Sequence, residues 1–325
     1  MSFFEEILGK LSDGRFHSGE VLANELHISR AAVWKQLKKI QSMGLSVDAV
    51  RGKGYRLQYP LELLNTELIM DYLSPEAMGN IHDLSVHTEI DSTNRFLLQL
   101  DHELCEKGVV CLAERQTMGR GRRGRQWVSP FGANIYLSVM WRYAHGPAQL
   151  SGLSLALGVA VMRVLSSYAI ENIGLKWPND IYWQQKKLGG ILVEIAGETN
   201  GPCTLVAGLG LNVSMTDGEN DIDQPWTCLQ DITQSENLSR NRLAAELIEQ
   251  MLMILQDYSQ KGFSAYQQEW QQWDVMFNKA VSLSSTAGER RGIVQGVDSE
   301  GGLLLKTSQG IEVINSGEVS LRLQS

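Results

Sequence analysis

The chain has 325 residues, which is long enough for two domains, or for three if one or two are small. Its 43% hydrophobic, 7% aromatic and 20% charged residues lie close to globular averages, which excludes a disordered or collagen-like chain. A formal net charge of −8 argues against a protein that coats nucleic acid along its whole surface. Residues 1–65 nevertheless carry 9 Lys and Arg against 7 Asp and Glu, so one small basic module is compatible with the composition.

Export and membrane signals are not evident in the sequence. The amino-terminal segment MSFFEEILGK carries acids where a signal peptide would be basic. The longest apolar stretch, Leu150–Val164, is interrupted by Ser, Gly and Arg and falls short of a membrane span. We therefore expect a cytoplasmic protein with free thiols rather than disulfides or zinc ligands, because no C-x-x-C spacing occurs among the cysteines Cys105, Cys111, Cys203 and Cys228.

Residues 1–65 predict a helix-turn-helix module. The first helix is expected over Phe3–Leu11, and Ser18 can cap a second helix from Gly19 to about Leu26. After a three-residue turn, Ser29 can cap a third helix. The apolar stripe of this third helix follows the spacing i, i+4, i+7 and consists of Val33, Leu37 and Ile40.

A hairpin with two cations at its tip follows the third helix. Its strands are expected at Leu45–Val50 and Tyr55–Leu57, joined by the turn Arg51-Gly-Lys-Gly54. Such a hairpin is typical of the wing of a DNA-binding module, although a small helical packing module with a solvated basic face is the alternative. The side chains that we expect to face DNA are Ser29, Arg30, Trp34, Lys35, Lys38, Arg51 and Lys53.

Strands and helices alternate beyond Pro60 and predict a mixed α+β domain. Long amphipathic helices are expected over Leu150–Val164 and from Arg240 to about Tyr258, and the run Asp91-Ser-Thr-Asn94 can cap a shorter helix. The predicted strands are Ser85–Ile90, Val109–Ala113, Asn134–Trp141, Gly174–Trp177, Ile191–Ile195 and Leu205–Val213.

After about Asp274 the apolar pattern has a period of two. This pattern, cut by glycine-containing turns, predicts five short strands in a small barrel. The alternating residues are Val281, Leu283, Ile293, Leu303, Leu305, Ile311, Val313, Val319, Leu321 and Leu323. The turns are expected at Ala287–Gly288, Gly301–Gly302, Gln309–Gly310 and Ser316–Gly317.

The run Gly119-Arg-Gly-Arg-Arg-Gly-Arg125 indicates an anion site. Glycines let backbone N–H groups turn toward an anion, and guanidinium groups add charge-assisted hydrogen bonds to phosphate or carboxylate. The run is not a Walker loop, because Gly124 is followed by Arg125-Gln126 instead of Lys and Ser or Thr. A solvated basic loop and an RNA-binding tract are the alternatives.

Two further segments carry candidate site residues. In Lys176-Trp-Pro-Asn-Asp180, the proline can hold Asn179 and Asp180 in a fixed turn, where the aspartate could orient a cation or a metal, or the segment is only a turn. Lys187, next to two glycines and a buried strand, could place its charge on a phosphate or a developing oxyanion, or be an exposed turn lysine.

Together these motifs resemble those of the biotin-protein ligases, in the same order and approximate spacing. The motifs are DSTN (91–94), QTMGRGRRGRQW (116–127), SPFGAN (129–134), KWPND (176–180), KLGGILVE (187–194) and GLGLNV (208–213). With FHSGE (16–20), SRAAV (29–33) and RGKGY (51–55), the whole chain resembles the bifunctional bacterial form, which also represses the biotin operon. Matches are weak over 215–230 outside Trp226, and Thr117–Met118 departs from the pattern with little consequence.

The resemblance implies an α+β fold in three parts. These are a winged helix-turn-helix domain at residues 1–65, a class II synthetase-like mixed α/β ligase domain at 66–274 and an SH3-like β-barrel at 275–325. It also implies a biotin-[acetyl-CoA-carboxylase] ligase that forms biotinyl-5′-AMP from biotin and Mg-ATP and transfers biotin to a lysine of the biotin carboxyl carrier protein. With biotinyl-AMP bound, such a protein forms a homodimer and represses biotin synthesis genes at operator DNA.

The resemblance further assigns site residues by position. It implies that biotin contacts Ser92, Thr93, Asn94, Gln116, Arg120, Gly121, Arg122 and Lys187. It implies that ATP and the adenylate contact Lys176, Asn179, Asp180, Asn212, Trp226 and Arg322. The implied catalytic residues are Lys187, Arg120 and Asp180, and the implied Mg²⁺ ligands are Asp180 and Asn179.

Three other functions compete with this interpretation. A lipoate-protein ligase would carry an R-R-x-S-G-G-G-A type run, which this sequence lacks. A ligand-sensing repressor without ligase activity is disfavoured by the intact Lys187, Asp180 and arginine run. A ligase without DNA-binding activity remains the third alternative.

Overall fold

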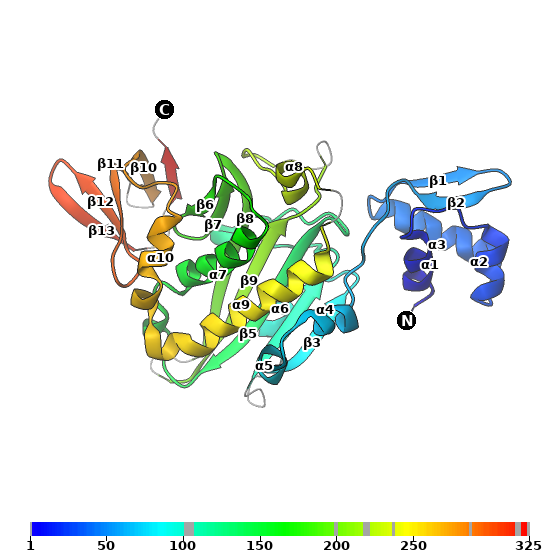
Figure 1. Ribbon diagram of the computed structural model, residues 1–325, viewed down its shortest axis with the longest axis horizontal. Helices are drawn as coiled ribbons and strands as arrows, with labels where there is room; N and C mark the ends of the chain where they lie inside the picture. Colours follow the sequence, from blue (N-terminus) through cyan, green and yellow to red (C-terminus); the bar gives the residue numbers. More distant parts are fainter. Residues whose placement is uncertain are drawn as a thin grey trace.

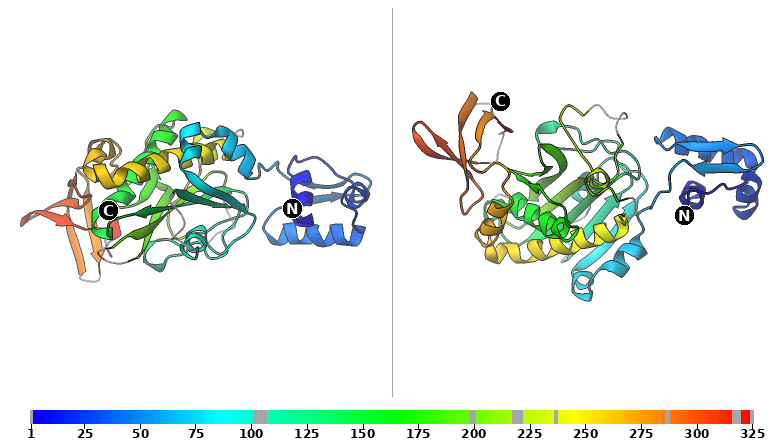
Figure 2. Two further views of the ribbon diagram at one scale, coloured as in Figure 1. Left: turned by 90° about the horizontal axis from the view of Figure 1, so that it is seen from below. Right: turned by 45° about the horizontal axis from the view of Figure 1, so that its top comes forward.

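The computed structural model describes residues 2–100, 107–197, 201–216, 222–235, 238–285, 288–315 and 320–323. A helical amino-terminal module and a carboxy-terminal sheet lie at opposite ends of a larger central domain (Figure 1, Figure 2). Of the predictions, Cys105, Ala287, Val319 and the turn at Ser316–Gly317 lie outside the described residues. Cys111, Cys203 and Cys228 are free and buried, as predicted.

The amino-terminal module has the predicted order of three helices and a hairpin. Its elements are α1 (Phe3–Leu11), α2 (Gly19–Glu25), α3 (Arg30–Ser42), β1 (Val47–Val50) and β2 (Gly54–Leu57). The hydroxyl groups of Ser18 and Ser29 accept hydrogen bonds from the first turns of α2 and α3, so both predicted caps are confirmed. The stripe Val33, Leu37 and Ile40 is buried, also as predicted.

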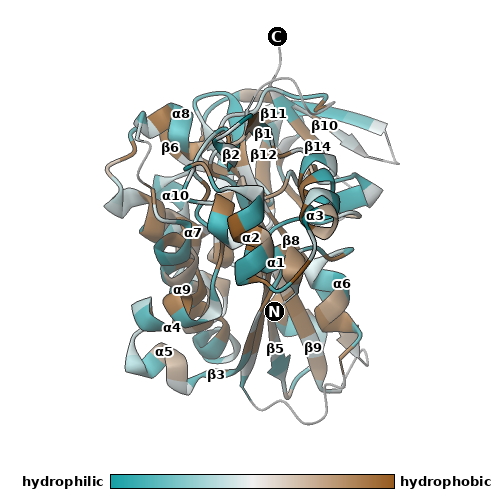
Figure 3. Ribbon diagram, turned by 90° about the vertical axis from the view of Figure 1, so that its right-hand side faces the viewer, coloured by the Kyte–Doolittle hydropathy of each residue, from teal (hydrophilic) through white to brown (hydrophobic). Residues whose placement is uncertain are grey.

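A seven-stranded sheet forms the centre of the molecule. Its strand order is β3-β4-β5-β9-β8-β7-β6, with β3 and β4 parallel and the other neighbours antiparallel. In Figure 3 the long strands β5 and β9 are coloured mostly as hydrophobic. The strands are β3 (Ile81–His87), β4 (Gly108–Ala113), β5 (Asn134–Tyr143), β6 (Ile173–Lys176), β7 (Asp180–Trp183), β8 (Lys186–Gly197) and β9 (Cys203–Asn212).

Both faces of this sheet are covered, which explains the continuous apolar run of β4. Alternate residues of a strand point to opposite faces. Val110 and Leu112 belong to the main core, whereas Val109 and Cys111 pack with Leu97 in a separate cluster on the other face. The main core lies under α7 (Leu153–Ser167) and α9 (Arg240–Lys261), and the second cluster lies under α6 (Thr93–Leu98).

Helix α7 is the central core helix of this domain. By length and composition alone, the segment Pro147–Ser167 could cross a membrane, but 67% of its most apolar window is buried inside the fold. The helix packs against α9 along the same face of the sheet (Figure 2). Its apolar character therefore has a structural explanation in the core.

Several elements differ from the sequence prediction. The strand predicted at Ser85–Ile90 instead spans Ile81–His87, because it is an edge strand whose exposed His82 and Asp83 conceal the pattern. Strand β7 was not predicted, since a turn was expected at Asn179–Asp180. Four short helices and three 3₁₀ turns were not predicted either. These are α4 (Thr66–Tyr72), α5 (Pro75–Gly79), α8 (Leu229–Thr233), α10 (Gln267–Gln272) and the 3₁₀ turns Arg122–Gly124, Pro147–Leu150 and Phe263–Ala265.

The carboxy-terminal segment forms the predicted five strands in the order β13-β12-β11-β10-β14. Val281, Leu283 and Val294 lie in its core. Part of the alternating pattern does not face this core, because Ile293, Ile311 and Val313 are exposed. The strands are β10 (Ala280–Ser285), β11 (Gly288–Val297), β12 (Leu303–Thr307), β13 (Gly310–Ile314) and β14 (Ser320–Leu323).

A buried ion pair joins the segment after the amino-terminal module to the central domain. Arg240 at the start of α9 donates to Glu114 at 2.8 Å, and both side chains are 4% exposed. Arg240 also donates to the carbonyl oxygens of Glu62 and Asn134, and Glu114 accepts from the backbone N–H of Leu64. Residues 62–64, which connect the amino-terminal module to the central domain, are thus hydrogen-bonded to buried side chains of the central domain.

Removal of Arg240 should destabilise the central domain strongly. In Arg240→Leu the carboxylate of Glu114 stays buried without its partner, which costs about 3–5 kcal/mol. We expect a clear decrease in the urea midpoint of unfolding. The matched control is Arg242→Leu, which removes the exposed ion pair with Glu246 on the same helix and should have a much smaller effect. Equal midpoints for the two variants would contradict this interpretation.

Candidate active site

A pocket of about 610 Å³ lies between the central sheet, the arginine-rich loop (residues 119–127) and the carboxy-terminal sheet. It gathers side chains that are far apart in the sequence. Twelve of the fourteen predicted ligand-binding residues line it: Ser92, Thr93, Asn94, Gln116, Arg120, Gly121, Arg122, Lys176, Asn179, Asp180, Lys187 and Arg322.

One end of the pocket is neutral and polar. Ser92 caps α6, so that Thr93 and Asn94 stand at the first turn of this helix and are buried. The side-chain oxygen of Gln116 accepts from the backbone N–H of Thr93 at 2.9 Å and from its hydroxyl group at 3.1 Å. Ser138 on β5 donates to the side-chain oxygen of Asn94 at 2.6 Å. These bonds hold donors and acceptors in place before any ligand binds.

Two glycines of β9 make room for this arrangement. A Cβ atom on Gly208 would lie 2.2 Å from the side-chain oxygen of Asn94, and one on Gly210 would lie 2.5 Å from the indole ring of Trp127. Both distances are too short for real contacts, so any side chain would displace Asn94 or Trp127. The glycines of the GLGLNV motif therefore allow the side chains of Asn94 and Trp127 to pack directly against the backbone of β9.

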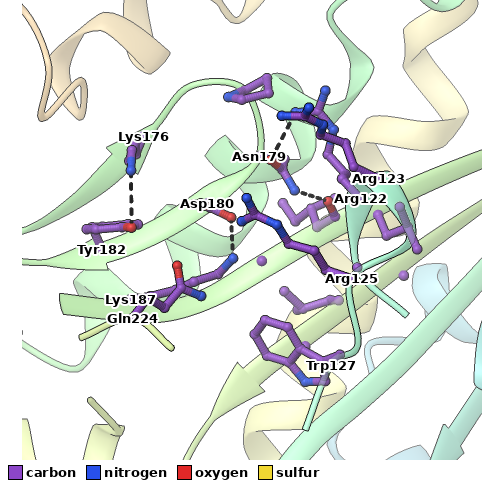
Figure 4. Close-up of a pocket in the computed structure, with 18 of the residues that line it drawn as sticks. Arg122, Arg123, Arg125, Trp127, Lys176, Asn179, Asp180, Tyr182, Lys187 and Gln224 are labelled. Atoms are coloured by element: carbon purple, nitrogen blue, oxygen red, sulfur yellow. Dashed lines mark hydrogen bonds and ion pairs between the residues drawn. The ribbon is translucent and has the colours of Figure 1, made fainter. Parts of the chain in front are cut away.

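The arginine-rich loop is tied down at two points. The Arg120 guanidinium donates to Glu194 on β8 at 2.8 Å, and the Arg122 guanidinium donates to Asn179 at 3.2 Å. Within the loop, the backbone N–H of Gly121 donates to the carbonyl oxygen of Arg125. Burial lowers the pKa of Arg122, which Asp180 partly offsets. Arg122 therefore faces the interior of the pocket (Figure 4).

Lys187 and Asp180 meet across the β7–β8 hairpin. Their charged groups are 2.6 Å apart, and the side chains are only 15% and 19% exposed. The ammonium group of Lys187 also lies 5.4 Å from the ring centre of Trp127. Figure 4 shows this pair beside Arg125 and Gln224. The predicted lysine is thus a pocket residue rather than an exposed turn residue.

The other end of the pocket is strongly cationic. Lys176 donates to the phenol oxygen of Tyr182 at 3.2 Å, and burial is the main cause that lowers the pKa of Lys176. The positive charges of Lys187, Arg322 and Arg125 lower it further. Eight lining residues are Lys or Arg, whereas only Asp180 and Asp223 are acidic. A site with this imbalance favours a polyanion such as a nucleotide.

Two predicted residues do not line the pocket. Asn212 is buried at the end of β9 and donates to the carbonyl oxygen of Thr227 at 3.0 Å. Trp226 lies next to Lys187 through a backbone bridge, and its predecessors in the sequence reach the pocket instead. The backbone N–H of Thr227 also donates to the carbonyl oxygen of Lys187. Both predicted residues therefore support the strand that carries Lys187.

Sequence reasoning also missed several lining residues. Trp127 was noted only as the end of the arginine run, yet its indole N–H is buried without a hydrogen-bond partner among the described residues. Its position next to the run was the available signal. The other missed lining residues include Tyr182, Gln184, Gln185, Asp223, Gln224 and Lys279.

The predicted DNA-facing residues are exposed on the amino-terminal module, at the other end of the molecule. Trp34 is 56% exposed on α3, with the ammonium group of Lys38 5.5 Å from its ring centre. The cations of the hairpin turn, Arg51 and Lys53, are exposed as well. The remaining exposed members are Ser29, Arg30 and Lys35.

Comparisons with known proteins cover nearly the whole chain. Residues 5–56 match an HTH domain, residues 86–212 the biotin/lipoate A/B protein ligase family and residues 276–322 the biotin protein ligase C-terminal domain. The chain is 42% identical to the bifunctional ligase/repressor BirA of Escherichia coli over 98% of this chain and 96% of that protein. It is 32% identical to BirA of Bacillus subtilis over 94% of each chain.

A solved structure supports the fold of three quarters of the chain. The biotin protein ligase from Aquifex aeolicus in complex with biotin and ATP superimposes with a TM-score of 0.65 at 30% identity. It covers 75% of this chain and 100% of that chain.

The close approach at Gly208 leads to a testable expectation. In Gly208→Ala the new methyl group collides with Asn94, whose hydrogen bonds to Ser138 and Glu194 must then change. Overpacking of this kind costs about 1–3 kcal/mol, which thermal unfolding would detect as a lower midpoint. The control is Gly79→Ala, where no atom lies within 4 Å of the new methyl group. An unchanged midpoint for Gly208→Ala would show that Asn94 has room to move.

Proposed function

The chain belongs to the biotin-protein ligase family, in its bifunctional ligase/repressor form, and from this premise we propose how its own residues carry out the two activities. It is an ATP-dependent biotin-protein ligase with an amino-terminal DNA-binding domain. We propose the domain ranges 1–65, 66–274 and 275–325 and a cytoplasmic location. The observation that carries the ligase proposal is the pocket with one neutral polar end and one cationic end.

The reaction joins two anions before it joins biotin to a protein. A carboxylate oxygen of biotin attacks the α-phosphorus of ATP, the bond to the bridging oxygen breaks, and pyrophosphate leaves. The amine of a lysine on the biotin carboxyl carrier protein then attacks the acyl carbon of biotinyl-5′-AMP, a proton is lost and AMP leaves. Because carboxylate and triphosphate repel each other, positioned cations must neutralise both before they reach attack distance.

The neutral polar end of the pocket suits the ureido ring of biotin. Thr93, Asn94 and Gln116 present hydroxyl and amide groups that are already held in place by hydrogen bonds. Such a site needs little reorganisation when a ligand with N–H and C=O groups binds. Ser92 contributes by capping the helix that carries these residues.

The cationic end suits the adenylate and the departing pyrophosphate. Lys187 would leave Asp180 to contact the biotin carboxylate and the α-phosphate, and Arg122, which lines the same pocket, would act at the same phosphate. Lys176 and Arg322 would neutralise the outer phosphates, with Lys279 beside them. Asn212 and Trp226 would act indirectly, through the strand that carries Lys187.

Magnesium enters this scheme with ATP. Mg²⁺ in such sites is held by one or two carboxylates and the substrate phosphates. Among the described residues there is no group of three side chains that could hold a metal ion alone. Asp180 fits as a single ligand, but Asn179 fits poorly because its oxygen accepts from Arg122 and its amide group donates to the carbonyl oxygen of Ile191.

The repressor activity would use the exposed face of the amino-terminal module. Helix α3 would enter the major groove, with the cations of the hairpin turn on the phosphates. Binding of biotinyl-AMP would order the arginine-rich loop and favour a homodimer, which would place two modules on operator half-sites. One intermediate would thus serve both catalysis and repression of biotin synthesis genes.

The ligase proposal predicts a specific dependence on Lys187. Incubation of the wild-type chain with ATP, biotin and a carrier domain should add one biotinyl group to the carrier, read by mass. Lys187→Gln should lower the adenylation rate about 100-fold to 1,000-fold, because a positioned charge at the reacting phosphate is lost. Lys186→Gln is the matched control, since Lys186 is exposed on the same strand. No mass increase with the wild-type chain would refute the ligase proposal.

The repressor proposal predicts ligand-dependent DNA binding. Affinity for promoter DNA of biotin synthesis genes should rise when biotin and ATP are present, in gel shifts at one stated salt concentration. Arg51→Ala should weaken binding in both conditions and reduce the salt slope by about 1. Equal affinity with and without ligands would refute the linkage. Absence of binding in both conditions would favour a ligase without DNA-binding activity.

A further inference from the structure

We propose that Glu194 is a positioning residue that holds the arginine-rich loop closed over the biotin end of the pocket. The inference rests on the proposed ligase function and gives a role to Glu194, which ends the KLGGILVE motif but was not among the predicted site residues. Glu194 lies on β8 and is not among the residues that line the pocket. It therefore acts through the side chains that it holds rather than through contact with substrate.

One carboxylate oxygen of Glu194 connects the arginine-rich loop to Asn94 at the first turn of α6. It accepts from the Arg120 guanidinium at 2.8 Å and from the side-chain amide of Asn94 at 2.8 Å. Asn94 is buried, and its remaining bonds go to Ser138 and to the carbonyl oxygen of Leu192. Because Asn94 is fixed on all sides, Arg120 is fixed through Glu194 to the group proposed to bind the ureido ring.

The second attachment of the loop is to Asn179, in the turn before β7, which is itself bonded to β8. Asn179 accepts from Arg122 at 3.2 Å and donates to the carbonyl oxygen of Ile191 on β8 at 2.8 Å. Ile191 and Glu194 are three residues apart, and Ile191 and Leu192 between the two attachments line the pocket. The loop is therefore attached on one side to Glu194 on β8 and on the other to Asn179, and its residues line the pocket together with Ile191 and Leu192.

The two attachments differ in strength. Arg122 is partly buried, whereas Arg120 is exposed, with side-chain exposures of 39% for Arg120 and 24% for Glu194. An ion pair with this exposure is partly screened by water and salt, so it contributes modestly and weakens as ionic strength rises. The Glu194–Arg120 pair is thus the attachment that can open, which both the release of biotinyl-AMP and the access of a carrier lysine require.

The test measures how fast bound biotinyl-AMP leaves the protein. Labelled intermediate is formed from biotin and ATP on the full chain, excess unlabelled biotin is added, and the loss of bound label is followed at low and at high salt. Glu194→Gln keeps an acceptor for Asn94 but removes the charge that pairs with Arg120. We expect release about twofold to fivefold faster than from wild type at low salt, with the difference shrinking at high salt.

Two further variants separate positioning from a general loss of stability. In an Arg120→Gln background, Glu194→Gln should add nothing, because its partner is already neutral. Glu269→Gln removes an ion pair with Arg163 of similar exposure (35% and 32%) far from the pocket lining and should leave release unchanged.

Each other outcome has a distinct meaning. Equal release from wild type and Glu194→Gln, or a difference that persists unchanged at high salt or without Arg120, would overturn the positioning role alone. Slower release from Glu194→Gln would also overturn it, since the carboxylate would then repel the anionic intermediate. If the wild-type chain accumulated no intermediate at all, the proposed ligase function would fail and this inference with it.

Discussion

The site depends on the compensation of positive charges that are held close together in one partly buried pocket. Arginine and lysine side chains from the loop, the central sheet and the carboxy-terminal sheet converge there, and their mutual repulsion must be offset before a ligand arrives. Asp180 pairs with Lys187, Glu194 pairs with Arg120, and Asn179 accepts from Arg122. An anionic ligand can take the place of Asp180 beside Lys187 and of Asn179 beside Arg122, so these two cations gain favourable contacts in the complex, whereas the Glu194–Arg120 pair continues to hold the loop.

The amino-terminal module is connected to this pocket by more than a flexible linker. Phe131, in the loop after Trp127, packs into the core of that module together with Leu61. Thr88, four residues before the cap of α6, donates to Glu5 on α1 at 2.7 Å. The buried Glu114–Arg240 pair holds the intervening backbone. Segments that lead into the biotin end of the pocket therefore touch the proposed DNA-binding module directly.

The secondary-structure predictions that the structure confirms are those with strong signals in neighbouring residues. Capped helices such as α2 and α3, and the buried strand β4, were predictable because caps and apolar periodicity are local signals. Edge strand β3 was misplaced because its exposed His82 and Asp83 conceal the apolar pattern, and β7 was missed because a turn was expected at Asn179–Asp180, although β7 pairs with its sequence neighbours β6 and β8. Apolar Ile311 and Val313 were expected in a core, but they lie on the edge strand β13 and are exposed.

The sequence by itself determined the three-part order of the chain, the caps of its main helices and twelve of the residues that line the pocket, because adjacent residues and short motifs carry that information. Only the tertiary structure decided which cation pairs with which acceptor. Glu194 lies 74 residues from Arg120 and 100 from Asn94, and Asn212 turned away from the pocket to hold Thr227. These contacts arise from the register of β8 and β9 in the folded sheet, which no local pattern encodes.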